Sequence, residues 1–391
     1  MNSPESAPLI VFAGGGTGGH LYPALAVADE LRRTKPDFQF VFYGSQRAID
    51  QKILSARNCT LVQQSLRPLS AKPWHWWGIL ASINRARQHC RKAFLGHRPL
   101  AVVGTGGLAS VPAVLEAARM GIPTALINPD VIPGKANKFL AGRVDVVFAQ
   151  FAESVAHLSR RARVAVTGCP VRPEFLSTRR ENAIIRFELD PHRKTLLVTG
   201  ASQGARTIND AVLANADFLA DRVDWQVLHL TGEGDYERVR AAYQGTGVRA
   251  VVLTYTEHRS DALVAADLVV SRAGASTLAE LTAVGRASIL FPYPFHRDNH
   301  QAVNAASLVR ANAAIMVKDE RDAMTNGPAL RGVLNSLLPD ASRIAGMSAA
   351  ARQLGHPQAA TEMASTLLRL VEGNSAKATA DSLQQSRSLA R

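Results

Sequence analysis

A glycine-rich segment at residues 14–19 separates the apolar run at residues 9–12 from an apolar helical pattern that begins at Leu21. Glycines between a strand and a helix leave backbone N–H groups open to an anion, and the positive end of the helix dipole favours phosphate there. His20 follows the glycines directly, and an imidazole can take up a proton near neutral pH. These residues predict an anion-binding loop with a candidate general base. The alternative is an ordinary histidine at a helix start, surrounded by solvent.

The glycine spacing contains the dinucleotide-binding pattern G-x-G-x-x-G, but the acidic residue expected at the end of the second strand is missing. That strand ends in Tyr43-Gly44-Ser45. A P-loop does not fit either, because no Lys-Ser or Lys-Thr pair follows the glycines. The loop therefore argues against a nicotinamide cofactor and favours another phosphate-bearing ligand.

A second glycine-rich turn, residues 104–107, follows another predicted strand and leads to Ser110, which is placed to cap a helix with Pro112 in its first turn. This turn could hold a pyrophosphate, and the case improves if the two loops converge at one edge of a sheet. The alternative is a plain capped turn.

In the second half of the chain, the stretch SRAGASTLAELTAVG follows a predicted strand and starts a helix near Ser276. The N–H groups of residues 275–277 would then point at a phosphate, with Arg272 beside them. Glu280 is a candidate for binding ribose hydroxyls. In the alternative, Glu280 completes a capping box with Thr277 and only satisfies a backbone donor.

The stretch PYPFHRDNHQAVNA comes next, and its prolines end a strand. Asp298 can cap a helix that places Gln301 and Asn304 three positions apart on one face. Amide side chains both donate and accept hydrogen bonds, which suits sugar hydroxyls. A solvated polar face is the alternative.

Three of the four tryptophans lie within four positions, just ahead of a basic helical stretch at residues 85–92. Aromatic residues beside a basic helix suit an anionic membrane interface, whereas a core helix with a charged outer face is the alternative. The candidate membrane-facing residues are Trp74, Trp76, Trp77, Ile79, Leu80 and Ile83.

The formal net charge of the 391 residues is +13, which indicates an anionic partner: nucleic acid, a phosphate-bearing substrate or an acidic membrane surface. Scattered basic residues, without zinc-finger or ribonucleoprotein signatures, argue against nucleic acid. Cys59, Cys90 and Cys169 lie too far apart to indicate a metal cluster or a disulfide framework, so a reducing cytoplasm is expected. No signal peptide or membrane-spanning run is found, and we expect a soluble or peripheral protein.

The elements that carry these residues alternate between short apolar runs and longer segments of helical period, which is typical of βαβ units around a parallel sheet. Strands are expected at residues 9–12, 38–43, 100–103, 124–127, 144–148 and 163–166, and in a second series at residues 195–200, 225–230, 248–253, 268–271, 288–291 and 314–317. Both series open with a strand, a small-residue turn and a helix, so the chain is predicted to form two α/β domains.

The expected organisation is a disordered N-terminus at 1–7, an N-terminal domain at 8–170, a linker at 171–194, a C-terminal domain at 195–340, C-terminal helices at 341–372 and a disordered tail at 373–391.

Seven motifs in order resemble those of the MurG family of GT-B glycosyltransferases, bacterial enzymes that add N-acetylglucosamine to lipid I in peptidoglycan synthesis. They are GGGTGGHLYPALAVA, GTGGLASVPAVLEAA, PGKANKFLA, TGCPVR, GASQGARTIN, SRAGASTLAELTAVG and DNHQAVNA, and the resemblance covers about residues 9–370. It implies two Rossmann-like α/β domains with parallel sheets facing a cleft. UDP-N-acetylglucosamine would bind mainly to the C-terminal half and the lipid-linked acceptor to the N-terminal half.

The resemblance also implies an inverting reaction in which the C4 hydroxyl of the acceptor attacks the anomeric carbon of the donor, giving a β-1,4 bond and lipid II. No cofactor or metal is expected, and the sequence has no Asp-x-Asp pair. The tryptophan-rich stretch lies where the family carries its membrane-contacting patch, which implies a peripheral protein on the cytoplasmic face of the bacterial membrane. Other cell-wall synthesis proteins are possible further partners.

Site roles follow from the resemblance by position. His20 and Thr17 match catalytic-loop positions, with His20 as the expected base. The donor-binding positions are Arg172, Ser202, Arg272, Ala275, Ser276, Thr277, Glu280, His300, Gln301 and Asn304. The positions for the acceptor and its pyrophosphate are Gly15, Gly16, Gly18, Gly19, Gly106, Gly107, Asp130 and Asn137.

The sequence departs from the family pattern in three places. Residues 127–130 read Ile-Asn-Pro-Asp where the family has His-Glu-Gln-Asn, Leu108 replaces an aromatic residue, and His300 replaces the first of two paired glutamines. These departures leave open altered acceptor handling, a modified precursor or a different hexosamine. The alternative functions are another lipid glycosyltransferase of this fold, a UDP-N-acetylglucosamine 2-epimerase, and an inactive peripheral membrane protein that binds UDP-sugar.

Overall fold

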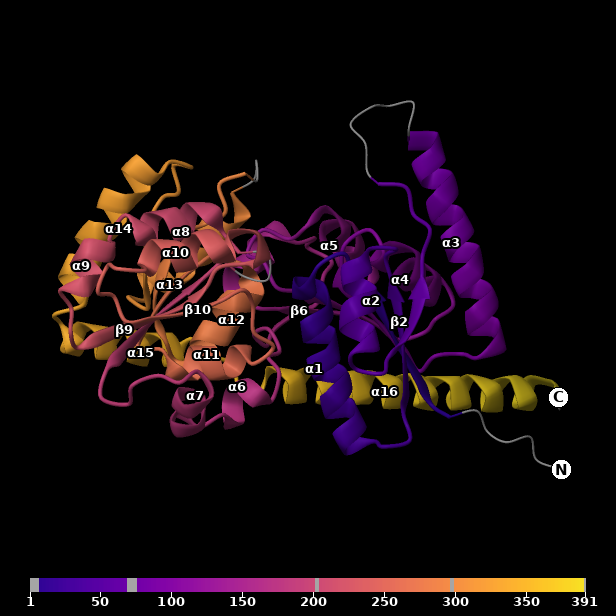
Figure 1. Ribbon diagram of the computed structural model, residues 1–391. Coiled ribbons are helices and arrows are strands. Elements are labelled where there is room, and N and C mark those ends of the chain that lie inside the picture. Colours follow the sequence, from indigo (N-terminus) through magenta and orange to yellow (C-terminus); the bar gives the residue numbers. More distant parts are fainter. Residues whose placement is uncertain (1–6, 69–75, 201–203, 296–298, 390–391) are drawn as a thin grey trace. The chain divides into compact units, whose positions relative to one another are not determined.

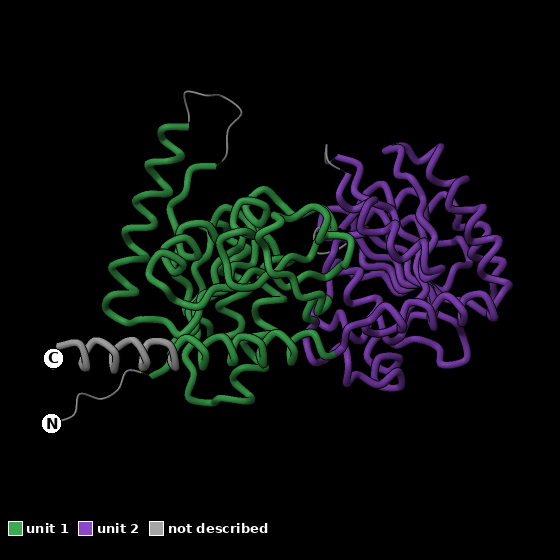
Figure 2. The backbone as a smooth tube through the Cα atoms, turned by 180° about the vertical axis from the view of Figure 1, so that it is seen from behind, with its two compact units in different colours: residues 1–170, 358–391 green, residues 171–357 purple. Residues whose placement is uncertain are grey.

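The chain forms two units, and its C-terminal segment returns to the first of them (Figure 2). Residues 1–170 and 358–391 form unit 1, and residues 171–357 form unit 2. The computed structural model describes residues 7–68, 76–200, 204–295 and 299–389, and for residues 375–389 it describes the backbone alone.

Unit 1 is built on a seven-stranded parallel sheet with the strand order β3-β2-β1-β4-β5-β6-β7 (Figure 1). The strands are β1 (Leu9–Gly14), β2 (Gln39–Gly44), β3 (Thr60–Gln63), β4 (Ala101–Gly106), β5 (Thr124–Asn128), β6 (Val146–Ala149) and β7 (Val164–Val166). The α-helices are α1 (Gly18–Thr34), α2 (Ala48–Ser55), α3 (Trp76–Gly96), α4 (Ser110–Arg119), α5 (Lys135–Leu140) and α16 (Ala359–Leu389).

Both faces of this sheet are covered, because side chains alternate between the two faces along each strand. In β1, Ile10 and Phe12 belong to one core cluster, while Val11 and Ala13 belong to another. The first cluster includes side chains of α1 and α16, and the second includes side chains of α3 and α4. The glycine-rich loop after β1 therefore begins from a strand that is fixed on both sides.

Unit 2 is built on a six-stranded parallel sheet with the order β10-β9-β8-β11-β12-β13. The strands are β8 (Lys194–Thr199), β9 (Trp225–Leu230), β10 (Ala250–Leu253), β11 (Leu268–Ser271), β12 (Ala287–Leu290) and β13 (Ala314–Met316). The α-helices are α6 (Glu174–Ser177), α7 (Arg180–Arg186), α8 (Arg206–Leu213), α9 (Ala216–Ala220), α10 (Tyr236–Tyr243), α11 (Arg259–Ala265), α12 (Ala275–Val284), α13 (His300–Arg310), α14 (Ala323–Leu337) and α15 (Ala341–Gln353). Its core joins strand side chains such as Val198, Val270 and Ile289 to those of α8, α14 and α15.

The two predicted series of strands are confirmed as two parallel sheets. Sequence reasoning missed β3, whose four residues TLVQ lie at the edge of the sheet and are mostly exposed. A strand of this length with little apolar alternation carries too weak a signal to be recognised.

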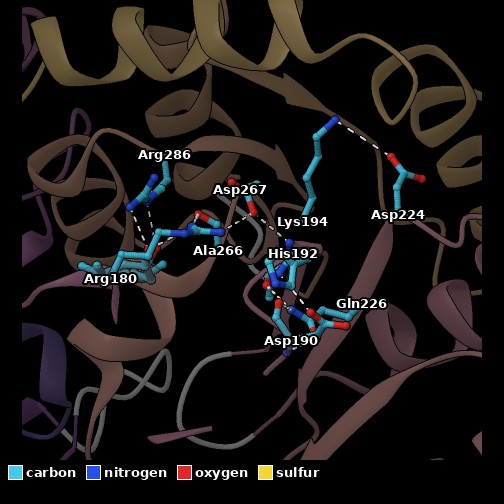
Figure 3. Close-up of polar contacts among 12 residues, drawn as sticks. Arg180, Asp190, His192, Lys194, Asp224, Gln226, Ala266, Asp267 and Arg286 are labelled. Atoms are coloured by element: carbon cyan, nitrogen blue, oxygen red, sulfur yellow. Dashed lines mark hydrogen bonds and ion pairs between the residues drawn. The ribbon is translucent and has the colours of Figure 1, made fainter. Parts of the chain in front are cut away.

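The segment at residues 171–194, expected to be a linker, folds as part of unit 2. Arg180 of α7 donates to Asp267 at 2.8 Å, and the N–H of Asp190 donates to Gln226 Oε1 at 2.9 Å (Figure 3). These bonds attach the segment to the loop before β11 and to β9, so it has fixed partners within the unit.

The C-terminal helices also divide differently from the expected organisation. α15 belongs to unit 2, whereas α16 packs against α1 of unit 1, where Thr361 donates to Glu30 at 3.1 Å. α16 continues to Leu389, where a disordered tail was expected from residue 373. Alanine, lysine, glutamine and leucine favour helix in this stretch. Residues 1–6 of the expected disordered N-terminus lie outside the described residues.

Candidate active site

The two glycine-rich loops of unit 1 lie side by side, because β1 and β4 are neighbouring parallel strands. A Cβ atom at Gly106 would lie 2.9 Å from both Cδ2 and Nε2 of His20, and one at Gly107 would also meet the first loop. The predicted convergence of the loops is therefore confirmed. Ser110 is the first residue of α4, and its hydroxyl donates to the carbonyl of Gly107 at 2.8 Å, so the expected helix cap is wrong.

His20, in the first turn of α1, is partly buried and oriented by the first loop. Its Nδ1 lies 2.8 Å from the carbonyl oxygen of Gly15. A carbonyl oxygen only accepts, so Nδ1 carries the hydrogen and Nε2 of the neutral ring keeps its lone pair. Thr17 is exposed at the N-cap, and Gly18 and Gly19 begin the helix. The arrangement does not match an unconstrained histidine in solvent.

A buried carboxylate that sequence reasoning missed, Asp50 of α2, holds the first loop. It accepts hydrogen bonds from the N–H of Gly16 (2.7 Å) and from the N–H and hydroxyl of Ser45 (2.8 and 2.7 Å). Arg47 donates to the carbonyl of Gly16 at 3.0 Å. A Cβ at Gly15 would lie 2.2 Å from Asp50 Oδ2, so the loop requires glycine there. The signal for this residue in the sequence is a carboxylate in a short amphipathic stretch.

Beside these loops, the predicted acceptor residues after β5 differ in accessibility. Asn137 is buried, and its amide donates to the carbonyl of Ile127 (3.1 Å) and to Asn128 Oδ1 (3.2 Å). Asn128 in turn donates to the carbonyl of Asp130 at 2.8 Å, and Asp130 is partly exposed. Asn137 therefore shapes this loop from within, while Asp130 lies where a ligand can reach it.

In unit 2, α12 begins at Ala275, and Gly274 at its N-cap makes no side-chain hydrogen bond. The N–H groups in the first turn of a helix have no acceptor within the helix. Residues 275–277 thus present a helix N-terminus at the carboxyl end of β11, as the sequence predicts. Ser276 is partly exposed, whereas Ala275 and Thr277 are buried.

Glu280, one turn further along α12, accepts a hydrogen bond from Arg259 at 2.8 Å. Both side chains are largely buried. Because α12 begins at Ala275, Thr277 lies inside the helix and the capping-box alternative is wrong. Among the described residues, no group is bonded to the second oxygen of Glu280, so that oxygen can accept from a ribose hydroxyl.

Arg272 was predicted to face a phosphate, and its geometry corrects that expectation. The residue is 7% exposed, and its guanidinium donates to Asp319 (2.6 Å), to Thr207 (2.8 Å) and to the carbonyl of Phe291 (3.2 Å). Burial raises the pKa of Asp319, but hydrogen bonds from Thr207 and Arg272 outweigh burial and hold that pKa below its ordinary value. Arg272 therefore braces the loop after β11 from inside.

Gln301, in the first turn of α13, connects two loops. Its Oε1 accepts from the N–H groups of Ala273 (3.2 Å) and Tyr293 (2.9 Å), which follow β11 and β12. These bonds use the amide oxygen, so a sugar hydroxyl would be bound by the NH2 group. Asn299 occupies the N-cap position without a side-chain hydrogen bond to the helix, and the predicted cap Asp298 lies outside the described residues.

The remaining donor-binding candidates differ in burial and in their contacts. Asn304 is fully buried, His300 is partly exposed, and both have polar or ring contacts of their own. The guanidinium of Arg172 lies over the ring of Phe175, 5.2 Å from its centroid. Ser202 lies outside the described residues.

The predicted membrane-facing residues lie at the beginning of α3, whose first turns extend beyond the sheet of unit 1 (Figure 1). Ile79 is only 6% exposed, so its prediction is wrong, and Ile83 is half-buried. Trp74 lies outside the described residues. The candidates with large exposed fractions are Trp76 (55%), Trp77 (82%) and Leu80 (59%).

Exposed basic residues continue along α3 at Arg85, Arg91 and Lys92, whereas Arg87 is paired with the buried Glu116 at 3.1 Å. Within the described ranges, no helix combines the length and apolar character needed to cross a membrane.

The two parallel-sheet units, with loops at the carboxyl ends of β1, β4 and β11, have the architecture of GT-B enzymes. Residues 10–149 match the N-terminal domain of glycosyltransferase family 28, and residues 195–363 match its C-terminal domain. The MurG crystal structure from Acinetobacter baumannii is similar, with a TM-score of 0.74 and 23% identity, covering 93% of this chain and 99% of that one. A UDP-GlcNAc 2-epimerase from Neisseria meningitidis, bound to UDP-GlcNAc, has a TM-score of 0.65 and 14% identity over 92% of this chain and all of that one. At these identities the likeness establishes the fold.

Curated relatives specify the family further. The chain is 36% identical to a protein of Desulforudis audaxviator, over 90% of this chain and 95% of that one, and 36% identical to a protein of Bacillus subtilis, over 92% and 99%. Both are named UDP-N-acetylglucosamine--N-acetylmuramyl-(pentapeptide) pyrophosphoryl-undecaprenol N-acetylglucosamine transferase. The chain belongs to this MurG family of glycosyltransferases.

Proposed function

We propose that this protein transfers N-acetylglucosamine from UDP-N-acetylglucosamine to the C4 hydroxyl of lipid I, forming lipid II for peptidoglycan synthesis. The observation that carries the proposal is the similarity to relatives named for this transfer, which extends over both units and at least nine-tenths of the chain. The arrangement of His20 supports it, because its Nε2 has an available lone pair beside two glycine loops.

The reaction that fits this arrangement is a direct displacement. Nε2 of His20 takes the proton from the acceptor hydroxyl, and the hydroxyl oxygen forms a bond to the anomeric carbon of the donor. The bond from that carbon to the phosphate oxygen breaks, and UDP leaves with the bonding electrons. Attack opposite the leaving group inverts the anomeric centre and gives a β-1,4 bond.

The donor is assigned to unit 2. The helix N-terminus at residues 275–277 would stabilise the negative charge of the departing diphosphate, together with Arg172 and Ser202. Glu280 would bind the ribose, and Gln301 would bind the sugar with Asn304 and His300 nearby. Arg272 supports this site indirectly through Asp319 and Thr207.

The acceptor is assigned to unit 1. Backbone N–H groups of the loops at residues 14–19 and 104–107 would face its pyrophosphate, with Thr17 and Asp130 at the accessible margin. Because residues 127–130 and Leu108 depart from the family pattern, the acceptor's peptide is the part of the substrate most open to variation.

We further propose that the start of α3 binds the anionic cytoplasmic face of the membrane, which brings the active site to its lipid substrate. Trp76, Trp77 and Leu80 would enter the interface, and basic residues add about 1 kcal/mol each near an anionic surface. Replacing Trp77 by alanine should weaken binding to vesicles of phosphatidylglycerol and phosphatidylcholine. Replacing Met324, exposed in unit 2, is the matched control.

Transfer of labelled N-acetylglucosamine from UDP to a short-chain lipid I analogue tests the proposal, in EDTA and with His20→Ala beside the wild type. Transfer by the wild type that falls by orders of magnitude in the variant supports both the activity and the base. Folded wild type that binds UDP-N-acetylglucosamine but transfers nothing overturns the assignment. A parallel reaction without lipid detects 2-epimerisation of UDP-N-acetylglucosamine. Reactions with other lipid acceptors test whether the enzyme is specific for a lipid other than lipid I.

A further inference from the structure

One peptide group connects the buried carboxylate of Asp50 to His20. The carbonyl of Gly15 and the N–H of Gly16 belong to the same planar peptide unit. The N–H donates to Asp50 Oδ1 at 2.7 Å, and the carbonyl oxygen accepts from His20 Nδ1 at 2.8 Å. Two hydrogen bonds thus connect the carboxylate to the peptide and the peptide to the imidazole.

The contacts of Asp50 define its chemical state. The backbone N–H of Gly16 is the donor at Oδ1, and the N–H and hydroxyl of Ser45 lie at Oδ2. Both oxygens are placed to accept, as in an ionised carboxylate. Asp50 is 0% exposed, and in such a low-dielectric position consecutive hydrogen bonds polarise one another.

We propose that Asp50 is a positioning residue for the transfer reaction, acting on His20 through the peptide between Gly15 and Gly16. Negative charge at the N–H end makes the Gly15 oxygen a stronger acceptor for Nδ1–H. This fixes the tautomer that leaves Nε2 free, and it stabilises the positive charge that His20 acquires with the acceptor's proton. A carboxylate bonded directly to a histidine has this effect in Ser-His-Asp enzymes; here one peptide unit lies between them.

The described groups that contact the loop or the ring beside Asp50 do not supply this negative charge. Arg47 is positive and donates to the carbonyl of the next residue, Gly16. The first turn of α1 has no acidic residue. The loop after β4 meets the ring with Gly106 and Gly107, which carry no side chains.

The substitution Asp50→Asn removes the negative charge and keeps the size of the side chain. An asparagine has one accepting oxygen, so its NH2 group must face either the N–H of Gly16 or the donors of Ser45. Asp50→Glu keeps the charge. The matched control is Asp145→Asn, because Asp145 accepts from the N–H (2.7 Å) and hydroxyl (2.9 Å) of Thr124 at the start of β5, the other end of the strands.

The role of His20 as base rests on the proposed function, so the first measurement uses no substrate. Nitrogen NMR of 15N-histidine-labelled protein, with His20 assigned by its loss in His20→Ala, should give the Nδ1–H tautomer in the wild type. Asp50→Asn should lower the population of that tautomer. A wild-type Nε2–H tautomer overturns the proposal even if the variant does not fold, as does an unchanged tautomer in a folded Asp50→Asn protein.

Kinetics give the second measurement. Asp50→Asn should lower kcat on the order of tenfold, as loss of a partner that orients a histidine does elsewhere. KM for UDP-N-acetylglucosamine should be unchanged, and Asp50→Glu should recover most of kcat. An equal loss in Asp145→Asn, or wild-type kcat in Asp50→Asn, contradicts the proposal. If the protein does not catalyse this transfer, the kinetic measurement cannot be made. The tautomer measurement still tests the proposal, because it uses no substrate.

Discussion

Replacing Gly106 by alanine should displace His20 while unit 1 stays folded. The new Cβ would lie 2.9 Å from Cδ2 and Nε2 of the ring, and ordinary contact begins at 3.4 Å, so the ring or the loop must withdraw by the difference. The loop has a φ of 108° at Gly106, which glycine adopts freely and alanine does not, and the ring is held by the carbonyl of Gly15.

The expected losses follow from this geometry. A non-glycine residue at such a φ costs about 1–3 kcal/mol of stability. A misplacement of about 1 Å can reduce a rate on the order of 100-fold, so a displacement of this size should lower kcat by roughly tenfold. KM for UDP-N-acetylglucosamine should not change, because the donor is assigned to unit 2.

Gly121→Ala is the matched control for this change. Gly121 also has a positive φ, 64°, but a Cβ there would meet nothing within 4 Å. It should cost about 1 kcal/mol of stability with normal transfer. Thermal unfolding and steady-state transfer to a lipid I analogue would be measured for both variants. Full activity in Gly106→Ala, or an equal loss of activity in Gly121→Ala, would refute the steric reasoning.

The remaining predictions concern unit 2. Glu280→Ala should raise KM for UDP-N-acetylglucosamine roughly 10-fold or more through loss of a bond from a ribose hydroxyl to a charged group, with steady-state kinetics as the measurement; an unchanged KM would contradict the ribose role. Arg272→Ala should lower the free energy of unfolding by about 3–5 kcal/mol in urea titration, because Asp319 keeps a buried charge without its partner. Since the pKa of Asp319 is lowered by folding, its stabilising effect in the wild type is present above about pH 4 and is lost on acidification. Burial lowers the pKa of His229 to about 3, so the wild type should lose stability as the pH falls from about 6.5 toward 3. In urea titrations at several pH values, His229→Gln should show a shallower dependence of stability on pH.

The contacts of His229 suit the neutral ring that its burial favours. Its two ring nitrogens lie 3.0 Å from Tyr243 Oη and 3.0 Å from Asn209 Oδ1. Asn209 also donates to the carbonyl of Thr231, where the chain leaves β9. These contacts stabilise the loops at the carboxyl end of the unit 2 sheet without adding a charge to the core.

The sequence by itself determined the two sheets and the ends of the strands at which chemistry takes place. Apolar runs followed by glycines gave strands that end in open loops, and parallel strands bring such loops to one edge. His20 and residues 275–277 could be placed from this local pattern, because each lies within a few residues of a strand end. A helical stretch at residues 85–92 was also predicted, but the burial of Ile79 was not, since a tryptophan-rich sequence does not reveal which of its apolar side chains pack on the core.

Only the tertiary structure decided how distant side chains meet. The bond from Gly16 to Asp50 joins residues 34 positions apart, and the pair of Arg272 and Asp319 joins residues 47 apart. Such contacts depend on which strands are neighbours and how each helix is rotated on the sheet, and periodicity in one segment carries neither quantity. The same reason explains why α16 was not placed on unit 1: its apolar side chains pack on the core of that unit, and local propensity does not identify the partner surface.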